Sequence, residues 1–512
     1  MPLTRSGDRH LRITPTGWTP QPQPTRGSVT LTADGSLSQT VAGQHLLSMA
    51  VNLLARQFCV VQRLVIDVPS VAVHDRVRPI GGSRNDLRGF LCDLALSVGG
   101  GVVAVEVGTT SASADVNIVA GSSHGTFPPS PVTLYCLGDG WKAFCSDQRP
   151  CPSDVPTSTN PAGPFLAACL AAGATFRALC GASSALDQAL TLWGFEVGEW
   201  DVIGRGPSSG IRLPAMYIIG LGAVGAALIE TLAATEGLSG ETVLIDPQEY
   251  SDTDLNRTVT GVYRDVGKLK VDVAAAQLGD ARLQAFPNPY RWPNYLVEQG
   301  RRVPPALAQE ERTGRYRWIL SCVDRNRDRR AIAGYGPRHV LGGSTDGLVS
   351  QVVYYSHVGD CECLACNHPL SDIPTTEELR EQLLSLPQAG RSEWYRRHDA
   401  SPDTVRAIEE YLSAPICGHI GEYEMQRLGV AGAPDWAAGF VSVAAGVMLA
   451  AAVQQSTVQG VASSFGLGAE VRYTFLTNRM MRSRARRRVD CPVCGEADTQ
   501  ARFARRWEGY GL

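Results

Sequence analysis

The stretch "MYIIGLGAVGAALIETL", residues 216–232, constrains the fold of this chain more than any other feature. It predicts a strand over 216–219, a glycine turn and a helix over 223–236, and the next apolar run predicts a strand over 242–245. A strand, a tight turn, a helix and a strand in this order are typical of a doubly wound α/β sheet, which binds ligands at the carboxyl ends of its strands. The sequence therefore predicts a Rossmann-like α/β domain.

The glycine turn has the pattern of a nucleotide site. Gly220-x-Gly222-x-x-Gly225 lets the backbone turn tightly and brings the amides of a helix N-terminus close to a phosphate. Asp246 follows Gly225 by 21 residues, close to the spacing of about 20 at which a carboxylate binds ribose hydroxyls. These residues alone indicate a dinucleotide such as NAD as the default ligand.

The segment after this acid favours ATP over NAD. Within "DPQEYSDTDLNRTVTGVYRDVGKLK" lie the polar and cationic side chains of Asn256, Arg257, Lys268 and Lys270. Hydride transfer has no evident use for these groups, whereas a triphosphate needs positive charge beside the ribose-binding strand. Another strand, "WILSCVD", ends in Asp324, which places a second acid where doubly wound sheets bind ligands.

In order and spacing, these motifs resemble those of the ThiF/MoeB-type adenylating proteins, a family that includes the ubiquitin-activating enzymes. The resemblance rests on the D-x-x-x-Y-x-x-x-D-L-N-R segment, "GKLK" and "SCVDRNRDRR", and it covers about residues 210 to 500. It implies a site for ATP and Mg²⁺ over the glycine loop. The implied roles are Asp246 on ribose, Asn256 and Arg257 at the phosphates, Lys270 on the triphosphate, and Asp324 helping to hold magnesium.

The cysteines point to a metal. Four of the 14 cysteines form two C-x-x-C pairs, Cys363 with Cys366 and Cys491 with Cys494. Four thiolates can close a tetrahedral structural Zn²⁺ site, and the long gap between the pairs resembles the split zinc knuckle of this family. Cys361 is left over and could compete as a ligand.

A long polar crossover, residues 367–434, lies between the first cysteine pair and a buried helix, with a helical segment expected near "DTVRAIEEYL". In ubiquitin-activating relatives this loop carries the cysteine that accepts the activated carboxylate as a thioester, so the resemblance makes Cys417 in "APICGHIGEYE" the candidate nucleophile. His419 could aid its deprotonation or be an exposed bystander. The alternative is that Cys417 is an incidental loop cysteine.

The first half of the chain has a different character. After a poorly ordered arm of about 40 residues, residues 1–205 alternate helical and strand-like runs without a glycine fingerprint, which predicts an α/β domain. Ubiquitin-activating enzymes pair an active adenylation domain with an inactive copy, so the resemblance implies that this domain is the inactive one. The active adenylation domain is expected over 206–512. Two apolar helical stretches of similar texture, one per half, indicate either related halves or similar composition alone. The expected assembly is a homodimer or a pseudo-dimer within the chain.

Composition limits the remaining classes. With 44% hydrophobic and 19% charged residues and a net charge of −3, the chain has no bulk attraction for nucleic acid, and the basic run at 481–488 is typical of a solvated strand end. The apolar window from Trp436 predicts a buried helix rather than a membrane span. No signal peptide is recognisable at the start, so we expect no membrane partner and a cytoplasmic location.

The expected function is therefore activation of a ubiquitin-like protein with a C-terminal glycine, working with a conjugating-type enzyme, as in bacterial conjugation systems linked to antiphage defence. Three classes remain as alternatives: a sulfur-carrier adenylyltransferase without a thioester, a dinucleotide oxidoreductase, and a non-enzymatic scaffold. A fusion of activating and conjugating enzymes would place its nucleophile at Cys92 or Cys136.

Overall fold

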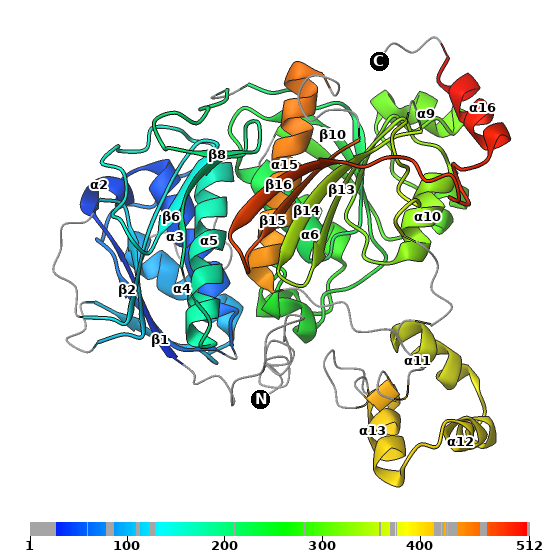
Figure 1. Ribbon diagram of the computed structural model, residues 1–512, viewed down its shortest axis with the longest axis horizontal. Helices are drawn as coiled ribbons and strands as arrows, with labels where there is room; N and C mark the ends of the chain where they lie inside the picture. The colour runs from blue at the N-terminus through cyan, green and yellow to red at the C-terminus, as the bar shows by residue number, and fades with distance from the viewer. Residues whose placement is uncertain are drawn as a thin grey trace.

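The computed structural model describes residues 27–508, with gaps at 59, 78–85, 109–112, 123–128, 184, 208–209, 280–281, 358–359, 369–373, 375, 414–420, 422–423, 426–427, 429–437 and 461–467. The side chain of residue 377 is also outside the description. Two α/β units lie side by side, the first in blue to teal and the second in green to red (Figure 1). We call residues 27–198 the N-terminal half and residues 216–508 the C-terminal half.

The N-terminal half is a sheet with helices on its faces. Its strands are β1 (Gly27–Ala33), β2 (Val61–Asp67), β3 (Ala104–Val107), β4 (Val116–Ala120), β5 (Val132–Asp139), β6 (Lys142–Ser146), β7 (Asp187–Thr191) and β8 (Glu196–Gly198). Its helices are α2 (Gly35–Ser38), α3 (Val41–Ala55), α4 (Leu87–Gly99) and α5 (Ala162–Leu179).

The C-terminal half is a second sheet with more connecting structure. Its strands are β9 (Met216–Ile219), β10 (Ser239–Ile245), β11 (Arg282–Asn288), β12 (Trp318–Ser321), β13 (His339–Asp346), β14 (Val349–Tyr355), β15 (Ala469–Thr474) and β16 (Arg479–Arg484). Its α-helices are α6 (Ala223–Ala234), α7 (Lys270–Leu278), α8 (Trp292–Val297), α9 (Ala308–Thr313), α10 (Asn326–Gly334), α11 (Thr376–Ser385), α12 (Gln388–Arg397), α13 (Pro402–Ser413), α15 (Gly439–Gln459) and α16 (Ala497–Arg506). The 3₁₀ turns are η1 (Asp252–Asn256), η2 (Tyr263–Asp265) and η3 (Pro305–Leu307).

The two sheets have the same topology. The strand orders are β3-β2-β1-β4-β5-β6-β7-β8 and β11-β10-β9-β12-β13-β14-β15-β16. In each sheet the first five strands of that order are parallel and the last three are antiparallel. The fold class expected from the sequence, two α/β units with a doubly wound sheet, is confirmed.

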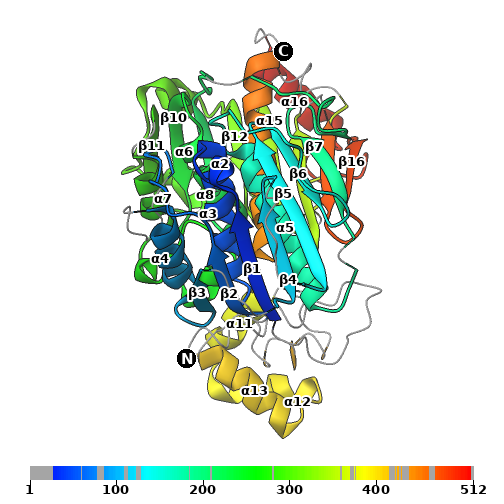
Figure 2. The same cartoon turned by 90° about the vertical axis from the view of Figure 1, so that its left-hand side faces the viewer.

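Two long apolar helices join the halves. α5 connects β6 to β7 and α15 connects β14 to β15, so they hold equivalent places, and they pack against each other between the sheets (Figure 2). Both are long and apolar enough to cross a membrane, yet 94% and 89% of their most apolar windows lie buried inside the protein. A helix that is apolar on all sides needs such complete burial. The buried helix expected after Trp436 is thus confirmed, and one core cluster runs through both halves.

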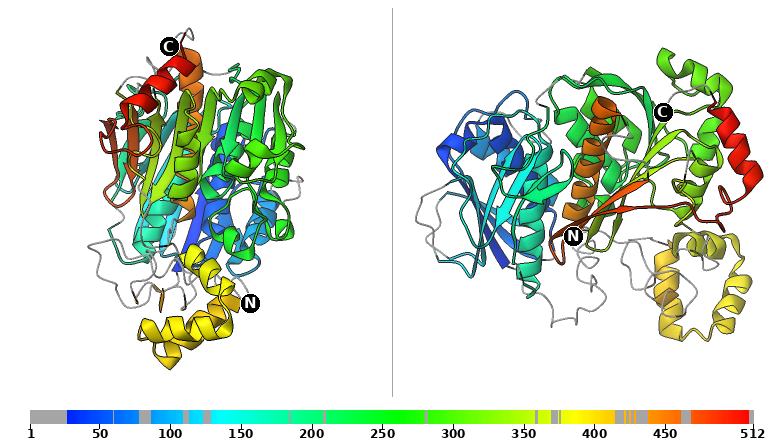
Figure 3. Two further views of the ribbon diagram at one scale, coloured as in Figure 1. Left: turned by 90° about the vertical axis from the view of Figure 1, so that its right-hand side faces the viewer. Right: turned by 45° about the horizontal axis from the view of Figure 1, so that its top comes forward.

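The crossover between β14 and α15 contains a small helical unit. Helices α11, α12 and α13 share their own core, which includes Leu379, Leu383, Tyr395 and Ile408. Figure 3 shows this unit, in yellow, set apart from both sheets. The helix expected near "DTVRAIEEYL" is α13, which is confirmed.

The arm expected over about 40 residues is too long. Of the first 40 residues, only residues 1–26 lie outside the description, and the rest include β1 and α2. β1 is a central strand of its sheet, and its Val29 and Leu31 are fully buried. The Thr- and Gly-rich composition concealed a strand that packing on both sides stabilises.

Candidate nucleotide and metal sites

The glycine loop lies between β9 and α6, where the strand order of the second sheet reverses direction. Gly220 has φ +90° and approaches the backbone of Cys322 so closely that an added Cβ would lie 2.8 Å from it. An added Cβ on Gly225 would lie 2.1 Å from the carbonyl oxygen of Gly220. At Gly222 a Cβ would meet nothing within 4 Å. The first and third glycines are therefore required by packing, whereas the second faces open space.

The start of α6 is open as well. Gly222 is its N-cap residue and provides no side-chain hydrogen bond to the helix amides. Residues 222–224 are partly exposed, although the rest of the helix is buried. An uncapped, accessible helix N-terminus presents N–H groups and the positive end of the helix dipole to an anion.

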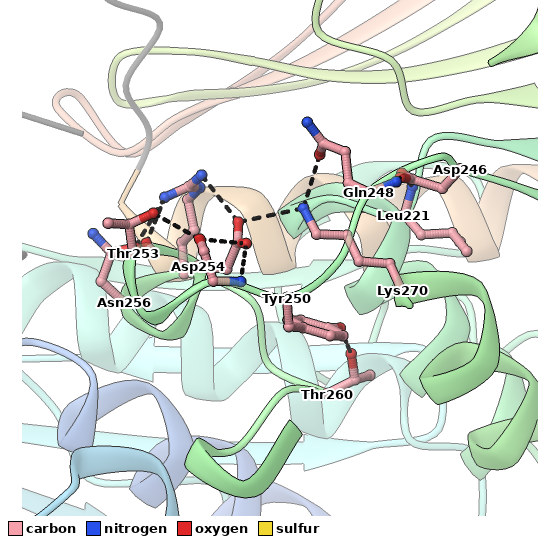
Figure 4. Close-up of polar contacts among 11 residues, drawn as sticks. Leu221, Asp246, Gln248, Tyr250, Thr253, Asp254, Asn256, Thr260 and Lys270 are labelled. Atoms are coloured by element: carbon pink, nitrogen blue, oxygen red, sulfur yellow. Dashed lines mark hydrogen bonds and ion pairs between the residues drawn. The ribbon is translucent and has the colours of Figure 1, made fainter. Parts of the chain in front are cut away.

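Asp246 directly follows β10 and is 5% exposed. Its Oδ2 accepts the N–H of Leu221 at 2.6 Å, and its Oδ1 accepts the N–H of Gln248 at 2.8 Å, so the carboxylate ties the glycine loop to the end of β10 (Figure 4). Burial raises the pKa of Asp246, opposed by Lys270 and by these two backbone N–H groups. Each carboxylate oxygen has a second lone pair with which to accept another hydrogen bond.

Lys270, the first residue of α7, brings a positive charge to the same place. It is 3% exposed, and its Nζ donates to Oε1 of Gln248 at 2.9 Å and lies 3.4 Å from Oδ1 of Asp254 (Figure 4). Arg257 also reaches Asp254, with Nη2 at 3.3 Å. Burial acts to raise the pKa of Asp254, but Arg257, Lys270 and Ser251 together lower it.

Asn256 and Arg257 end the turn η1. Asn256 is 2% exposed, and its Oδ1 accepts from Nη1 of Arg257 at 3.1 Å. The same Nη1 donates to the carbonyl of Thr253 at 2.9 Å. Lys268, another cation of this segment, instead pairs with Asp265 at 2.8 Å and is half exposed. The structure thus gathers Arg257 and Lys270 around Asp254, with Asn256 bonded to Arg257, and leaves Lys268 outside.

Asp324 lies three residues beyond the end of β12 and is exposed. Its charge contributes to the raised pKa of Asp246, at the edge where β10, β9 and β12 end. Oxygen ligands at such an edge suit Mg²⁺, which keeps several waters and binds through one or two carboxylates.

The two C-x-x-C pairs come together. Cys363, Cys366, Cys491 and Cys494 are buried, and their sulfur atoms all lie within 4.8 Å of one another. The Sγ atoms of Cys363 and Cys491 are 3.7 Å apart, and those of Cys366 and Cys494 are 3.4 Å apart. Once deprotonated, these four cysteines fit a tetrahedral metal ion, and Zn²⁺ is the metal that such sites favour. Cys361 is buried but is not part of the cluster.

The structure says less about the candidate nucleophiles that the sequence suggested. Cys417 and His419 lie outside the described residues. Cys136 is fully buried in β5, where burial raises the pKa of its thiol, and burial also raises the pKa of Cys92 on α4. Raised thiol pKa values do not suit a nucleophile. Together with the shared strand order, they argue against a conjugating-enzyme domain in the N-terminal half.

Sequence reasoning missed two residues of the site. Asp254 holds both cations, and Gln248 bonds Asp246 through its backbone and Lys270 through its side chain. Asp254 could have been found, because it stands inside the D-L-N-R motif itself. Gln248 carries no comparable signal.

The chain is an adenylyltransferase-like α/β protein with a glycine loop at the switch point of its second sheet. Residues 199–493 match the ThiF family, which is more than half of the 512 residues. The chain therefore belongs to the ThiF family, as its motifs led us to expect.

The relatives described next share at most 24% of their aligned residues with this chain. It is 24% identical over 370 residues to y4jF of Sinorhizobium fredii, described as an uncharacterized protein; the match covers 70% of this chain and only 64% of that relative. Among solved structures, E. coli MccB with ATP matches with 14% identity and a TM-score of 0.34, covering 55% of this chain and 66% of that one. MccB with MccA-N7isoASN matches with 16% identity and a TM-score of 0.35, covering 55% and 67%.

Proposed function

We propose that this chain uses ATP to activate a ubiquitin-like protein. The C-terminal glycine carboxylate of that protein attacks the α-phosphate, the bond between the α- and β-phosphoryl groups breaks, and an acyl-adenylate and pyrophosphate form. The sulfur of Cys417 then attacks the acyl carbon, AMP leaves, and a thioester remains on the enzyme.

The observation that carries this proposal is the meeting of an uncapped helix start with buried charges of both signs. Gly222, Asp246 and Lys270 come from three segments that converge at the carboxyl edge of one sheet. A dinucleotide site needs the first two, but a buried lysine beside them suits a ligand with more negative charge. Membership of the ThiF family supports the same conclusion.

In this proposal each residue has a positioning or electrostatic task. Asp246 uses its remaining lone pairs to accept ribose hydroxyls. Arg257 and Lys270, which pair with Asp254 in this structure, turn to the phosphates when the nucleotide binds, and Asn256 donates beside them. Positioning and charge neutralisation account for most of the catalysis in phosphoryl chemistry. Asp324 would hold Mg²⁺, which supplies further neutralisation of phosphate charge.

The cysteine cluster has a structural task in this proposal. Four thiolates leave no open position on Zn²⁺, so the metal takes no part in the reaction. It ties the segment before α16 back to the segment after β14.

The N-terminal half acts as an inactive adenylation-like domain. A cytoplasmic, bacterial antiphage conjugation system with a conjugating-type enzyme as the next acceptor is the setting we propose, on the basis of the motif resemblance.

The first experiment measures adenylation. Incubation with ATP, Mg²⁺, labelled pyrophosphate and the carrier protein should return label to ATP, and Asp324→Ala should abolish this exchange. Tight binding of NAD without exchange would refute the proposal and favour an oxidoreductase. Absence of both would favour a scaffold.

The second experiment decides the subclass. With ATP and the carrier, wild type should form a covalent adduct that excess thiol cleaves, and Cys417→Ala should lose the adduct while retaining pyrophosphate exchange. Should Cys417→Ala still form the adduct, the nucleophile would lie elsewhere. An exchange-competent wild type that forms no adduct would instead be a sulfur-carrier adenylyltransferase.

A further inference from the structure

Two side chains of the N-terminal half reach the backbone that carries the proposed phosphate ligands. Arg56 caps the C-terminus of α3, and its side chain is 1% exposed. Its Nη1 donates to the carbonyl of Leu255 at 2.6 Å, and its Nη2 donates to the carbonyl of Gly261 at 2.7 Å. The segment between these two carbonyls contains Asn256 and Arg257. One guanidinium thus holds both ends of that segment.

Asn52, one helical turn earlier on α3, completes the arrangement. Its Oδ1 accepts from Nε of Arg56 at 2.6 Å, and its Nδ2 donates to the carbonyl of Val259 at 3.1 Å. Nη2 of Arg56 also lies 3.4 Å from the Val259 carbonyl oxygen. Because the guanidinium is a planar fork of donors, the Asn52 bond fixes its orientation and thereby the positions of three carbonyls.

The electrostatics of Arg56 are unusual for a residue that only fills an interface. Its acceptors in the described part of the chain are three backbone carbonyls and one amide oxygen, all neutral. Burial lowers the pKa of Arg56 to about 9, with Tyr250 opposing the shift. A buried charge without an ionic partner is costly, and an apolar side chain would pack there at a lower cost. The arginine therefore indicates a need for its hydrogen-bond geometry.

The segment held in this way has α3 on one side and the candidate nucleotide site on the other. Its carbonyls at 255, 259 and 261 face Arg56 and Asn52, while the guanidinium of Arg257 faces Asp254. The start of α15 encloses the same segment, since an added Cβ on Gly439 would lie 3.3 Å from the Asn256 carbonyl oxygen.

We infer that Arg56, oriented by Asn52, is a positioning residue for the nucleotide site: it fixes the backbone from which Asn256 and Arg257 reach the phosphates. This inference rests on the proposed function. It gives the N-terminal half a part in ATP binding that acts through the backbone of residues 255–261.

The test compares binding of ATP and of adenosine to the full chain, with Mg²⁺ present, by calorimetry. Arg56→Met should weaken ATP binding about tenfold, the size expected for losing hydrogen bonds from a charged donor. Adenosine binding should stay within about twofold, because Asn256 and Arg257 meet only the phosphates. Equal losses for the two ligands would overturn the inference, since they would mean a general loss of structure.

Arg177→Met is the matched control. Arg177 is also buried, at 4% exposure, and also donates across the boundary between the halves, to the Leu476 carbonyl at 3.4 Å. It lies on α5, and its acceptor lies in the β15–β16 hairpin. This variant should bind both ligands like wild type. A selective loss of ATP binding in Arg177→Met would overturn the inference, because any buried interface arginine would then have the same effect.

A double variant tests whether Arg56 acts through Arg257. If it does, Arg56→Met should weaken ATP binding by no more than about twofold in an Arg257→Ala background. Additive losses would overturn the inference.

If thermal melting shows that Arg56→Met does not fold, Asn52→Leu replaces it. This variant removes the hydrogen bond from Asn52 to the Val259 carbonyl and the oxygen that accepts from Nε of Arg56. A wild type that binds no ATP would refute the proposed function itself, whereas selective failure of these variants refutes only the inference.

Discussion

The two halves share one strand order and differ at the place where a ligand would bind. In the N-terminal half the short helix α2 separates β1 from α3, and its Leu37 is 2% exposed. Leu37 lies against both Gly43 and Gly121, as an added Cβ on either would meet it within 3.2 Å. In the C-terminal half no helix intervenes between β9 and α6. The space after the first strand is therefore filled by α2 in the N-terminal half, and no helix fills the equivalent space in the C-terminal half.

The helix starts differ in the same sense. Thr40 caps α3, accepting the N–H of Gly43 at 2.9 Å, and the first turn of α3 is buried. Gly222 gives α6 no such cap. Yet Gly43 and Gly225 are each the third residue of their helix, and an added Cβ on either would lie 2.1 Å from a carbonyl oxygen of the preceding segment, Leu37 in α2 or Gly220 in the glycine loop. In the N-terminal half, α2 and the Thr40 hydroxyl thus occupy the place that no helix or side-chain cap occupies before α6.

The largest expected effect concerns a feature of the C-terminal half alone, the cysteine cluster. Metal analysis should find one zinc per chain, and Cys491→Ser/Cys494→Ser should lose it. Structural zinc contributes about 10 kcal/mol or more of binding free energy in small domains, so hydrogen exchange should rise around residues 361–366 and 491–508. Exchange in residues 27–198 should change little.

Cys361→Ser is the control for the metal experiment, because Cys361 is buried close to the cluster in sequence but lies outside it. It should retain the zinc. Full retention of metal by the double variant would show that the four thiolates are not the ligands.

The next effect uses the two equivalent glycines. Gly225→Ala and Gly43→Ala both force a Cβ against a carbonyl oxygen and should each lower the free energy of unfolding by about 1–3 kcal/mol. Only Gly225→Ala moves the proposed phosphate loop, so it alone should weaken ATP binding, by about a hundredfold. Chemical unfolding and calorimetry measure the two quantities. Equal losses of ATP binding would show that the halves do not differ in function as we propose.

Acid should destabilise both halves through two histidines, His45, which is buried, and His339, which is partly buried. Burial lowers the pKa of His45 in α3 and of His339 in β13 to about 3. Because these folded-state values lie below the unfolded value of about 6.5, the stability that they contribute is present above pH 6.5 and is lost as the pH falls. Each histidine should lower the free energy of unfolding by about 2 kcal/mol between pH 7 and pH 5.

His45→Leu removes one of these groups. Between pH 7 and pH 5 the unfolding free energy of wild type should therefore fall by about 2 kcal/mol more than that of the variant. Urea unfolding at the two pH values measures the difference. A variant as acid-sensitive as wild type would mean that His45 does not titrate with unfolding.

The smallest effects come from exchanging the helix caps. Thr40→Ala should cost about 1 kcal/mol of stability without changing ATP binding. Gly222→Ser should fold, since its Cβ has open space, and should gain a few tenths of a kcal/mol from the new cap. The added hydroxyl would compete with phosphate for the amides, so ATP affinity should fall. Unchanged affinity in Gly222→Ser would place the phosphates elsewhere.

The sequence by itself determined the parts that depend on neighbouring residues. The strand at 216–219, the start of α6 at 223 and the place of Asp246 after β10 all follow from alternation of apolar residues and glycines, because backbone preferences act over a few residues. The family motifs, taken in order, indicate Asn256, Arg257 and Lys270. The C-x-x-C spacing likewise named the four cysteines that the fold brings together.

Tertiary structure alone decided which distant segments meet. Nothing near Arg56 in the sequence predicts that it binds carbonyls about 200 residues away, and the composition of residues 27–40 concealed a central strand. In the N-terminal half Leu37 lies against Gly43 and Gly121, and in the C-terminal half Asp254 pairs with two cations, Arg257 and Lys270. Such contacts depend on the packing of whole sheets and helices, whose free energy is shared among many residues and is not written in any one stretch.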